Sequence, residues 1–180
     1  GEAAYGAPVA SRASHCTPEH APLSHVPFND LAALHAAVES RTVAVVLEPL
    51  QSQGAIVAAT EEYLKGAEAL CRELGILLIL DEAHTGMGRC GALLAENLYG
   101  VHADILALGA GLGGGVPLAA VLVRNSACCA PLAGLPDARY SNAVTAAAGL
   151  AVLKTVLDAG FLEHVQDTGR HLREGLSRLA

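Results

Sequence analysis

An acidic residue directly follows a run of apolar residues near the middle of the chain. Residues 77–80 are Leu-Leu-Ile-Leu, and Asp81 comes next. Since an open α/β sheet presents its ligand-binding groups at the carboxyl ends of its strands, this spacing predicts a charge delivered to a ligand crevice. A carboxylate there can pair with a protonated ring nitrogen and so keep a pyridinium as an electron sink. The alternative is an acid that caps the turn after the strand, which is common at strand ends.

A second apolar run is followed by a glycine-rich stretch. Residues 105–108 are Ile-Leu-Ala-Leu, and three consecutive glycines follow at 113–115. Glycine adopts backbone conformations that other residues avoid, so these positions would let the chain turn tightly beside a bound group. Three glycines alone are typical of any turn. The neighbouring segments therefore have to show whether this turn lies beside a bound group or is an ordinary connection.

Four segments, taken in order and with their spacing, resemble the class III aminotransferases, which use pyridoxal phosphate (PLP). They are residues 48–54 (EPLQSQG), 81–91 (DEAHTGMGRCG), 99–106 (YGVHADIL) and 112–117 (LGGGVP). The resemblance covers residues 25–180. Met87 and the run at 28–31 favour the acetylornithine/ornithine branch, whereas Ala83 and residues 117–120 are also similar to dialkylglycine decarboxylase.

The resemblance implies a role for each matching residue. Asp81 would pair with the pyridine nitrogen, and Ala83 would pack against the ring. His84 stands where the family has a glutamine that hydrogen-bonds the phenolic oxygen of the ring; an imidazole N–H can donate the same bond, although it also titrates. Glu48 would lie at the substrate entrance.

The chain departs from the family pattern at the residues that carry the chemistry. The position of the Schiff-base lysine is Ala110, and a methyl group can neither form an imine nor move a proton. The only lysines, Lys65 and Lys154, fall on predicted helices and are not placed to substitute. The family's phosphate-contacting threonine falls at Ala138 in an ungapped match, and Tyr140-Ser141 would replace it after a small shift. The phosphate-binding loop of the family, G-[ST]-x-A-x-E, is not in the sequence.

Three functional interpretations remain open. The resemblance implies an aminotransferase that moves an amino group between an ornithine- or acetylornithine-like amino acid and a 2-oxo acid through PLP. Because of Ala110, we expect this chain to be catalytically inactive and to bind PLP poorly. The alternative is a non-catalytic, degenerate homologue that acts as a dimerisation or regulatory partner. A third interpretation is an α/β ligand-binding domain that uses Asp81 without PLP.

Composition limits the partners. The net charge of −7 and the lack of a Lys/Arg cluster argue against nucleic acid. The longest apolar runs are far shorter than the roughly 20 residues that span a bilayer. No signal peptide is visible, so we expect a cytoplasmic protein, and the family implies a homodimer. Five cysteines, an odd number, favour reduced thiols. Adjacent Cys128 and Cys129 could form a metal or redox pair, but packing is favoured, and no metal site is expected.

The element pattern predicts the α/β class. We expect a strand at 43–47, a helix from Thr60 to Gly75 and a strand at 76–80, which form a parallel crossover unit. Further elements are expected as follows: a short helix carrying Leu31, Leu34 and Val38, strands at 105–108 and 118–123, and helices at 143–158 and 161–179. The resemblance implies part of the large domain of a fold-type-I PLP-dependent transferase, with a mostly parallel sheet and flanking helices. That domain would occupy residues 1–135, and residues 136–180 would lead into the small C-terminal domain; both chain ends look cut.

Overall fold

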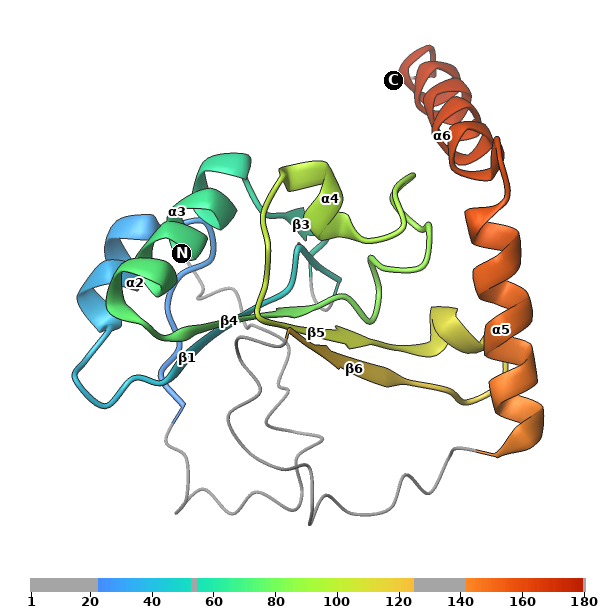
Figure 1. The fold of residues 1–180 in the computed structure, drawn as a ribbon. Helices are drawn as coiled ribbons and strands as arrows, with labels where there is room; N and C mark the ends of the chain where they lie inside the picture. The colour runs from blue at the N-terminus through green and yellow to red at the C-terminus, as the bar shows by residue number, and fades with distance from the viewer. Residues whose placement is uncertain (1–22, 53–54, 125–141, 180) are drawn as a thin grey trace.

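A four-stranded sheet lies at the centre of the computed structural model, which describes residues 23–52, 55–124 and 142–179 (Figure 1). The strand order is β1–β4–β5–β6. The first three strands are parallel and β6 pairs with β5 in the antiparallel direction. Their bounds are β1 Ala44–Leu47, β4 Leu77–Asp81, β5 Ile105–Leu108 and β6 Ala120–Val123. The expected mostly parallel sheet is confirmed.

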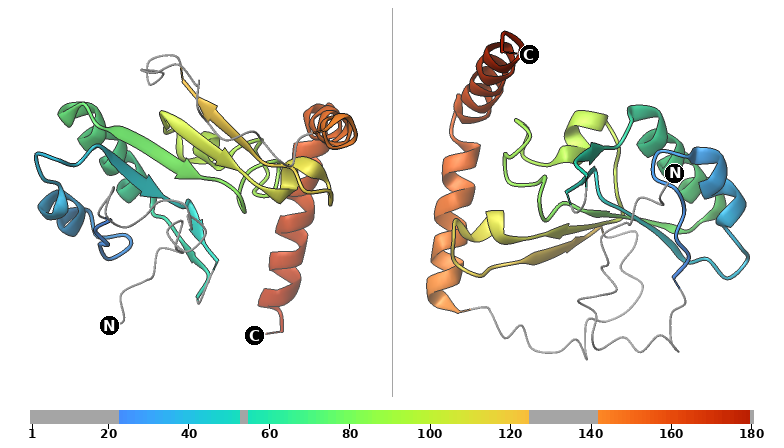
Figure 2. Two further views of the ribbon diagram at one scale, coloured as in Figure 1. Left: turned by 90° about the horizontal axis from the view of Figure 1, so that it is seen from below. Right: turned by 180° about the vertical axis from the view of Figure 1, so that it is seen from behind.

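Helices flank this sheet at two separate places. The helices α2 (Leu31–Ala37), α3 (Glu61–Leu74) and α4 (Ala95–Tyr99) lie on one face of the sheet (Figure 1). The remaining helical elements lie at the far end of the sheet (Figure 2). They are the 3₁₀ turn η1 (Ala110–Gly113), α5 (Ala143–Leu157) and α6 (Phe161–Ser177). No single helix in the described ranges is long and apolar enough to cross a membrane; α5 and α6 meet that criterion only as a pair, bent by 72°.

The crossover between β1 and β4 forms as the sequence predicts. Thr60 caps the start of α3, where its side chain accepts a hydrogen bond from the Tyr63 N–H at 3.2 Å. Gly75 ends the helix with a φ of 67°, the left-handed conformation that favours glycine. The chain then enters β4, whose Leu78 and Leu80 lie opposite Val45 and Leu47 of β1.

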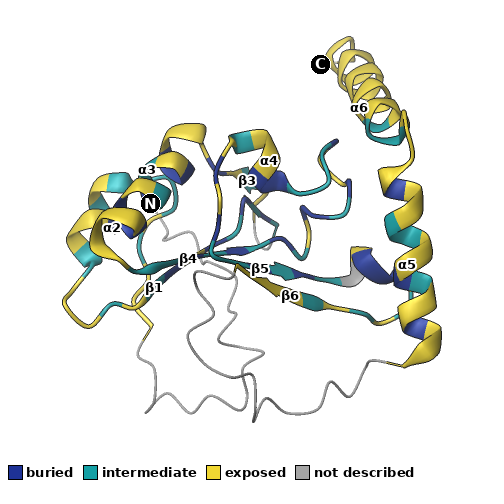
Figure 3. Cartoon of the chain, viewed as in Figure 1, coloured by how far each residue is buried: buried dark blue, intermediate teal, exposed yellow. Residues whose placement is uncertain are grey.

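The core lies between the sheet and the helices of its covered face. Alternate residues of each parallel strand point into it, as the period of two in a strand requires. These are Val45, Leu47, Leu78, Leu80 and Leu106, packed against a helical set that includes Tyr63, Leu64, Ala67 and Leu70. Leu108 is also buried but lies outside this cluster. Figure 3 shows that buried residues concentrate there, whereas α6 contains none.

Some elements differ from the prediction. Strand β4 extends through Asp81 instead of ending at residue 80, and β6 starts at Ala120 instead of residue 118. The short helix α4 and the hairpin of β2 (Leu50–Gln51) and β3 (Val57–Ala58) were not expected, because each is too short to leave a periodic pattern. The expected domain boundary between residues 135 and 136 lies outside the described residues and stays a prediction.

Asn29 connects the start of α2 to the hairpin and to α3. Its backbone is left-handed, with a φ of 62°, and its side chain donates to the Ala58 carbonyl at 3.0 Å. The same side chain accepts from the Thr60 N–H at 2.9 Å. The neighbouring Asp30 is the N-cap of α2, and its side chain accepts from the Ala33 N–H.

The variant Asn29→Ala is therefore expected to lower the free energy of unfolding by about 1–3 kcal/mol, since it loses both bonds and disfavours the left-handed backbone. Asn29→Asp keeps the acceptor for Thr60 and should lose less. Urea denaturation of the two variants measures the difference. Equal stability of Asn29→Ala and the parent chain would contradict this role.

Candidate functional site

A cavity of about 100 Å³ lies at the carboxyl ends of β1 and β4. Glu48, which follows β1, and Asp81, which ends β4, both line it. The other lining residues come from the segment before α2, from β1 and β2, and from α3: Ser24, His25, Val26, Phe28, Val46, Leu47, Gln51 and Tyr63. Two of the residues predicted from the sequence, Glu48 and Asp81, thus meet at one cavity.

Tyr63 contributes a buried hydroxyl group near this cavity. Only 1 % of the residue is exposed, and its hydroxyl has no hydrogen-bond partner among the described residues. Its ring meets Phe28 edge to face, with centroids 5.5 Å apart. Burial raises the pKa of the Tyr63 phenol, so the group stays protonated.

Asp81 caps the turn that follows its strand. Its Oδ1 accepts a hydrogen bond from the Ala83 N–H at 2.9 Å, as the capping alternative predicts. Within the described part of the chain, no hydrogen bond reaches its second oxygen. Asp81 can therefore cap the turn and still offer one carboxylate oxygen to a ring nitrogen.

The ends of β4 and β5 are in direct contact beside Asp81. A Cβ added to Gly109 would lie 2.8 Å from the Cβ of Ala83 and 3.0 Å from its Cα, so no other residue fits without displacement of the backbone. Ala110 follows directly and begins η1. The position that resembles the family's lysine position therefore comes immediately after the residue that packs against Ala83.

The other predicted site residues do not line the cavity or lie outside the described residues. His84 lies exposed in the turn after β4 and does not line the cavity. Ser141 lies outside the described residues, as does Ala138. The tight turn expected at 113–115 is confirmed, because Gly114 and Gly115 have φ values of 60° and 114°.

Sequence reasoning missed the role of Glu82. Only 1 % of this residue is exposed, and its carboxylate accepts from the N–H groups of Ala95 (2.6 Å) and Glu96 (2.8 Å) at the start of α4. The Thr85 hydroxyl donates to the same carboxylate at 3.3 Å. Its position after Asp81 was the available signal, because successive strand residues face opposite sides and an acid facing the core needs donors.

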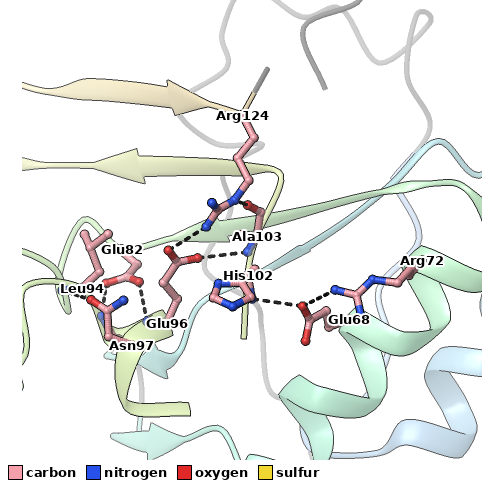
Figure 4. A network of polar contacts seen from close by, with 10 residues as sticks. Glu68, Arg72, Glu82, Leu94, Glu96, Asn97, His102, Ala103 and Arg124 are labelled. Atoms are coloured by element: carbon pink, nitrogen blue, oxygen red, sulfur yellow. Dashed lines mark hydrogen bonds and ion pairs between the residues drawn. The ribbon is translucent and has the colours of Figure 1, made fainter. Parts of the chain in front are cut away.

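A second buried acid extends the network (Figure 4). Glu96, 4 % exposed, forms an ion pair with Arg124 at 3.1 Å and accepts from the Ala103 N–H at 3.0 Å. Arg124 also donates to the Ala103 carbonyl at 2.6 Å. This network ties the end of β6 to α4 and to the loop that leads into β5.

The cysteines that the structure describes are free thiols. Cys71 is buried and Cys90 is exposed. Burial raises the pKa of Cys71 to about 11, which leaves it protonated and unreactive at neutral pH. Cys16, Cys128 and Cys129 lie outside the described residues, so the expectation for the adjacent pair stays untested.

The family follows from comparison with known proteins. The family model described as aminotransferase class-III matches residues 6–180. The chain belongs to this family. Acetylornithine aminotransferase 2 of Bordetella pertussis is 42 % identical over 153 residues, which cover 85 % of this chain and 39 % of that protein.

Solved structures agree with this assignment to the class-III aminotransferases. N-acetylornithine aminotransferase from Stenotrophomonas maltophilia matches with a TM-score of 0.76 and 31 % identity, over 86 % of this chain and 40 % of that one. Ornithine aminotransferase from Toxoplasma gondii, with partial occupancy of PLP at its active site, matches with a TM-score of 0.75 and 30 % identity. That match covers 91 % of this chain and 41 % of the other. The chain thus spans about two fifths of the length of the relatives it matches.

The described residues fit one end of the cofactor that this aminotransferase family uses. Asp81 offers a carboxylate oxygen at the cavity, which suits a pyridine nitrogen, whereas Ala83 is hydrogen-bonded to Asp81 but does not line the cavity. Ala110 does not suit covalent attachment, because its side chain has no nucleophilic atom.

The variant Gly109→Ala is expected to destabilise the chain by about 1–3 kcal/mol, because the new methyl group overlaps backbone and side-chain atoms of Ala83. Gly111→Ala is the matched control, since its Cβ would meet Met87 at an ordinary 3.4 Å. Chemical denaturation measures both. Comparable stability of the two variants would show that the β4 and β5 ends are not in contact.

Stability should also depend on the ionisation of Glu82. Burial raises its pKa above the ordinary 4.5, with a further rise from the nearby Glu96, although the hydrogen bonds it accepts oppose the shift. The native state then binds the proton more tightly than the unfolded state. The resulting stability is present below pH 4.5 and is lost as the pH rises through the raised pKa.

Between pH 4 and pH 8, Glu82→Gln is therefore expected to lose less stability with rising pH than the parent chain, as measured by urea denaturation at each pH. Glu61→Gln is a control of opposite sign, since Lys65 lowers the pKa of Glu61. Parallel pH profiles for Glu82→Gln and the parent would refute the assignment.

Proposed function

We propose that this chain is a catalytically inactive relative of acetylornithine and ornithine aminotransferases that retains the ring-binding end of a PLP site. One observation carries the proposal: the residue that follows Gly109, at the end of β5 next to Ala83, is alanine. An alanine at this position removes the nucleophile and the proton carrier that lysine would supply. The intact surroundings of Asp81 and Ala83 support retained recognition of a ring.

Each residue of this chain has a limited task in the proposal. Bound PLP supplies an electron sink. Asp81 would hold a proton on the ring nitrogen through its second carboxylate oxygen, and Ala83 would contact the ring face. His84, in the exposed turn outside the cavity lining, would donate to the phenolic oxygen. Glu48 lies at the same cavity as Asp81, and we propose that it would face the substrate. Ser141 is proposed as a phosphate contact.

The substrate class is also a proposal. The relatives are named for acetylornithine and ornithine, so we infer that the whole protein descends from an enzyme that took such an amino acid and a 2-oxo acid. The identity of 42 % to an acetylornithine aminotransferase supports this class.

A second candidate is a non-catalytic role in dimerisation or regulation. Exposed apolar side chains on α5 favour it: Val144, Leu150 and Leu157 are 73 %, 54 % and 61 % exposed. Such side chains on one helix favour association with another copy or another chain. Sedimentation velocity distinguishes a homodimer from a monomer.

The experiment for the main proposal is borohydride trapping with PLP, followed by peptide mapping. Because the chain has only two lysines, the double variant Lys65→Arg/Lys154→Arg removes every side-chain amine that could be labelled adventitiously. In that background we expect no label at residue 110. Adding Ala110→Lys should create a label there but no transamination. Transamination by the parent chain would overturn the proposal.

Non-covalent binding tests the retained ring site. Equilibrium dialysis with PLP should show binding that Asp81→Asn weakens by roughly tenfold or more, as expected for loss of a charge-assisted hydrogen bond. Lys65→Arg is the control, because Lys65 pairs with Glu61 on α3 and does not line the cavity. Equal affinity of the parent and Asp81→Asn would remove the proposed role of Asp81.

A further inference from the structure

Glu82 is a buried acid that the proposed function does not use. It follows Asp81 directly, and consecutive residues at the end of β4 face opposite sides of the sheet. Asp81 lines the cavity, whereas the buried Glu82 carboxylate points to the first turn of α4 (Figure 4). The two neighbouring carboxylates therefore occupy different environments on the two sides of one strand.

Three hydrogen bonds hold the Glu82 carboxylate in place. Its two carboxylate oxygens receive three donors, from Ala95, Glu96 and Thr85. No Lys or Arg within the described ranges forms an ion pair with it, because Arg124 pairs with Glu96 instead. The donors are thus the only partners that compensate for its burial there.

The backbone of Glu82 is held as firmly as its side chain. Its N–H donates to the Ala107 carbonyl of β5 at 2.8 Å, and its own carbonyl accepts from the Gly86 N–H at 2.9 Å. With both backbone groups and the side chain bonded, residue 82 is fixed relative to β5, α4 and the turn at once. Because Asp81 and Ala83 are the chain neighbours of Glu82, their backbone positions are constrained as well. A hydrogen bond from the Ala83 N–H to the Asp81 carboxylate links the two residues.

We propose that Glu82 is a positioning residue: by clamping the turn after β4 onto the first turn of α4, it fixes the Asp81 carboxylate and Ala83 at the ring-binding end of the site. This inference deepens the proposed function and rests on it for the identity of the ligand. Glutamate suits the task because both oxygens must accept. Glutamine would turn an NH₂ group toward a backbone N–H, and aspartate is one methylene too short to keep the same reach.

The test compares Glu82→Gln with Asp104→Asn in the full 180-residue chain. Both variants change an acid that hydrogen-bonds a backbone amide into the corresponding amide side chain. The Asp104 Oδ2 accepts from the Leu78 N–H at 2.9 Å, near the opposite end of β4 from Glu82. The readouts are hydrogen exchange of the Ala83 amide and the ¹³C chemical shift of the Asp81 carboxyl, neither of which needs a cofactor.

Glu82→Gln is expected to speed exchange of the Ala83 amide by about tenfold, the factor that corresponds to one lost hydrogen bond, and to shift the Asp81 carboxyl signal. Asp104→Asn should leave both readouts unchanged. Thr85→Val removes only one donor and should produce a smaller change in the same direction; it decides the question if Glu82→Gln does not fold. Unchanged Ala83 and Asp81 signals in the folded variant, or equal changes in Asp104→Asn, would overturn the inference.

A PLP-binding arm separates this inference from the proposed function. Where the parent chain binds PLP, Glu82→Gln should weaken binding about tenfold while Asp104→Asn leaves it unchanged. No binding by the parent chain would refute the proposed function, and the Ala83 and Asp81 signals would still decide the role of Glu82.

Discussion

The central strand β4 is held at both ends by acidic side chains that accept hydrogen bonds from backbone amides. Asp104 accepts from the Leu78 N–H near its start, and Glu82, just beyond its end, accepts from two amides of α4. Both acids lie outside the strand, so they fix its position without interrupting its ladder. The placement of Asp81, of the turn behind it and of the contact with Gly109 all depends on this arrangement.

The two buried acids of the network are stabilised in different ways. Glu96 has a cation, Arg124, whose side chain is 46 % exposed, so solvent weakens their attraction. Glu82 has no such partner among the described residues and relies on hydrogen-bond donors. In return it satisfies two amides at the start of α4, a five-residue helix that would be marginal alone. Burial of Glu82 and formation of α4 therefore depend on each other.

The sequence was sufficient for features that repeat locally. The continuous apolar run before Asp81, Thr60 at the helix start and Gly75 at its end together predict the crossover, and the position of Asp81 at the strand end follows from them. Two interpretations of Asp81 competed, and its two oxygens allow both, because one caps the turn and the other has no described partner.

What the sequence could not supply depends on contacts between distant residues. Two of the three donors to Glu82 lie 13 and 14 residues further along, so no short pattern reveals them. The hydrogen-bond partners of the Asn29 side chain lie 29 and 31 residues away. The contact of Gly109 with Ala83 likewise exists only once β4 and β5 pair. The roles of Ala83 and His84 stay predictions because they concern a ligand and not the packing of the chain, and Ser141 lies outside the described residues.

Helix α6 contacts the loop after β4 near its first residues. Its first residues pack beside Gly88, and the Gln166 side chain donates to the Gly91 carbonyl at 2.7 Å. No residue of α6 is buried. At a rise of about 1.5 Å per residue, roughly 16 Å of helix extends beyond Gln166. Helix α6 is thus joined to the loop between β4 and α4 near its first residues, and its later turns extend into solvent.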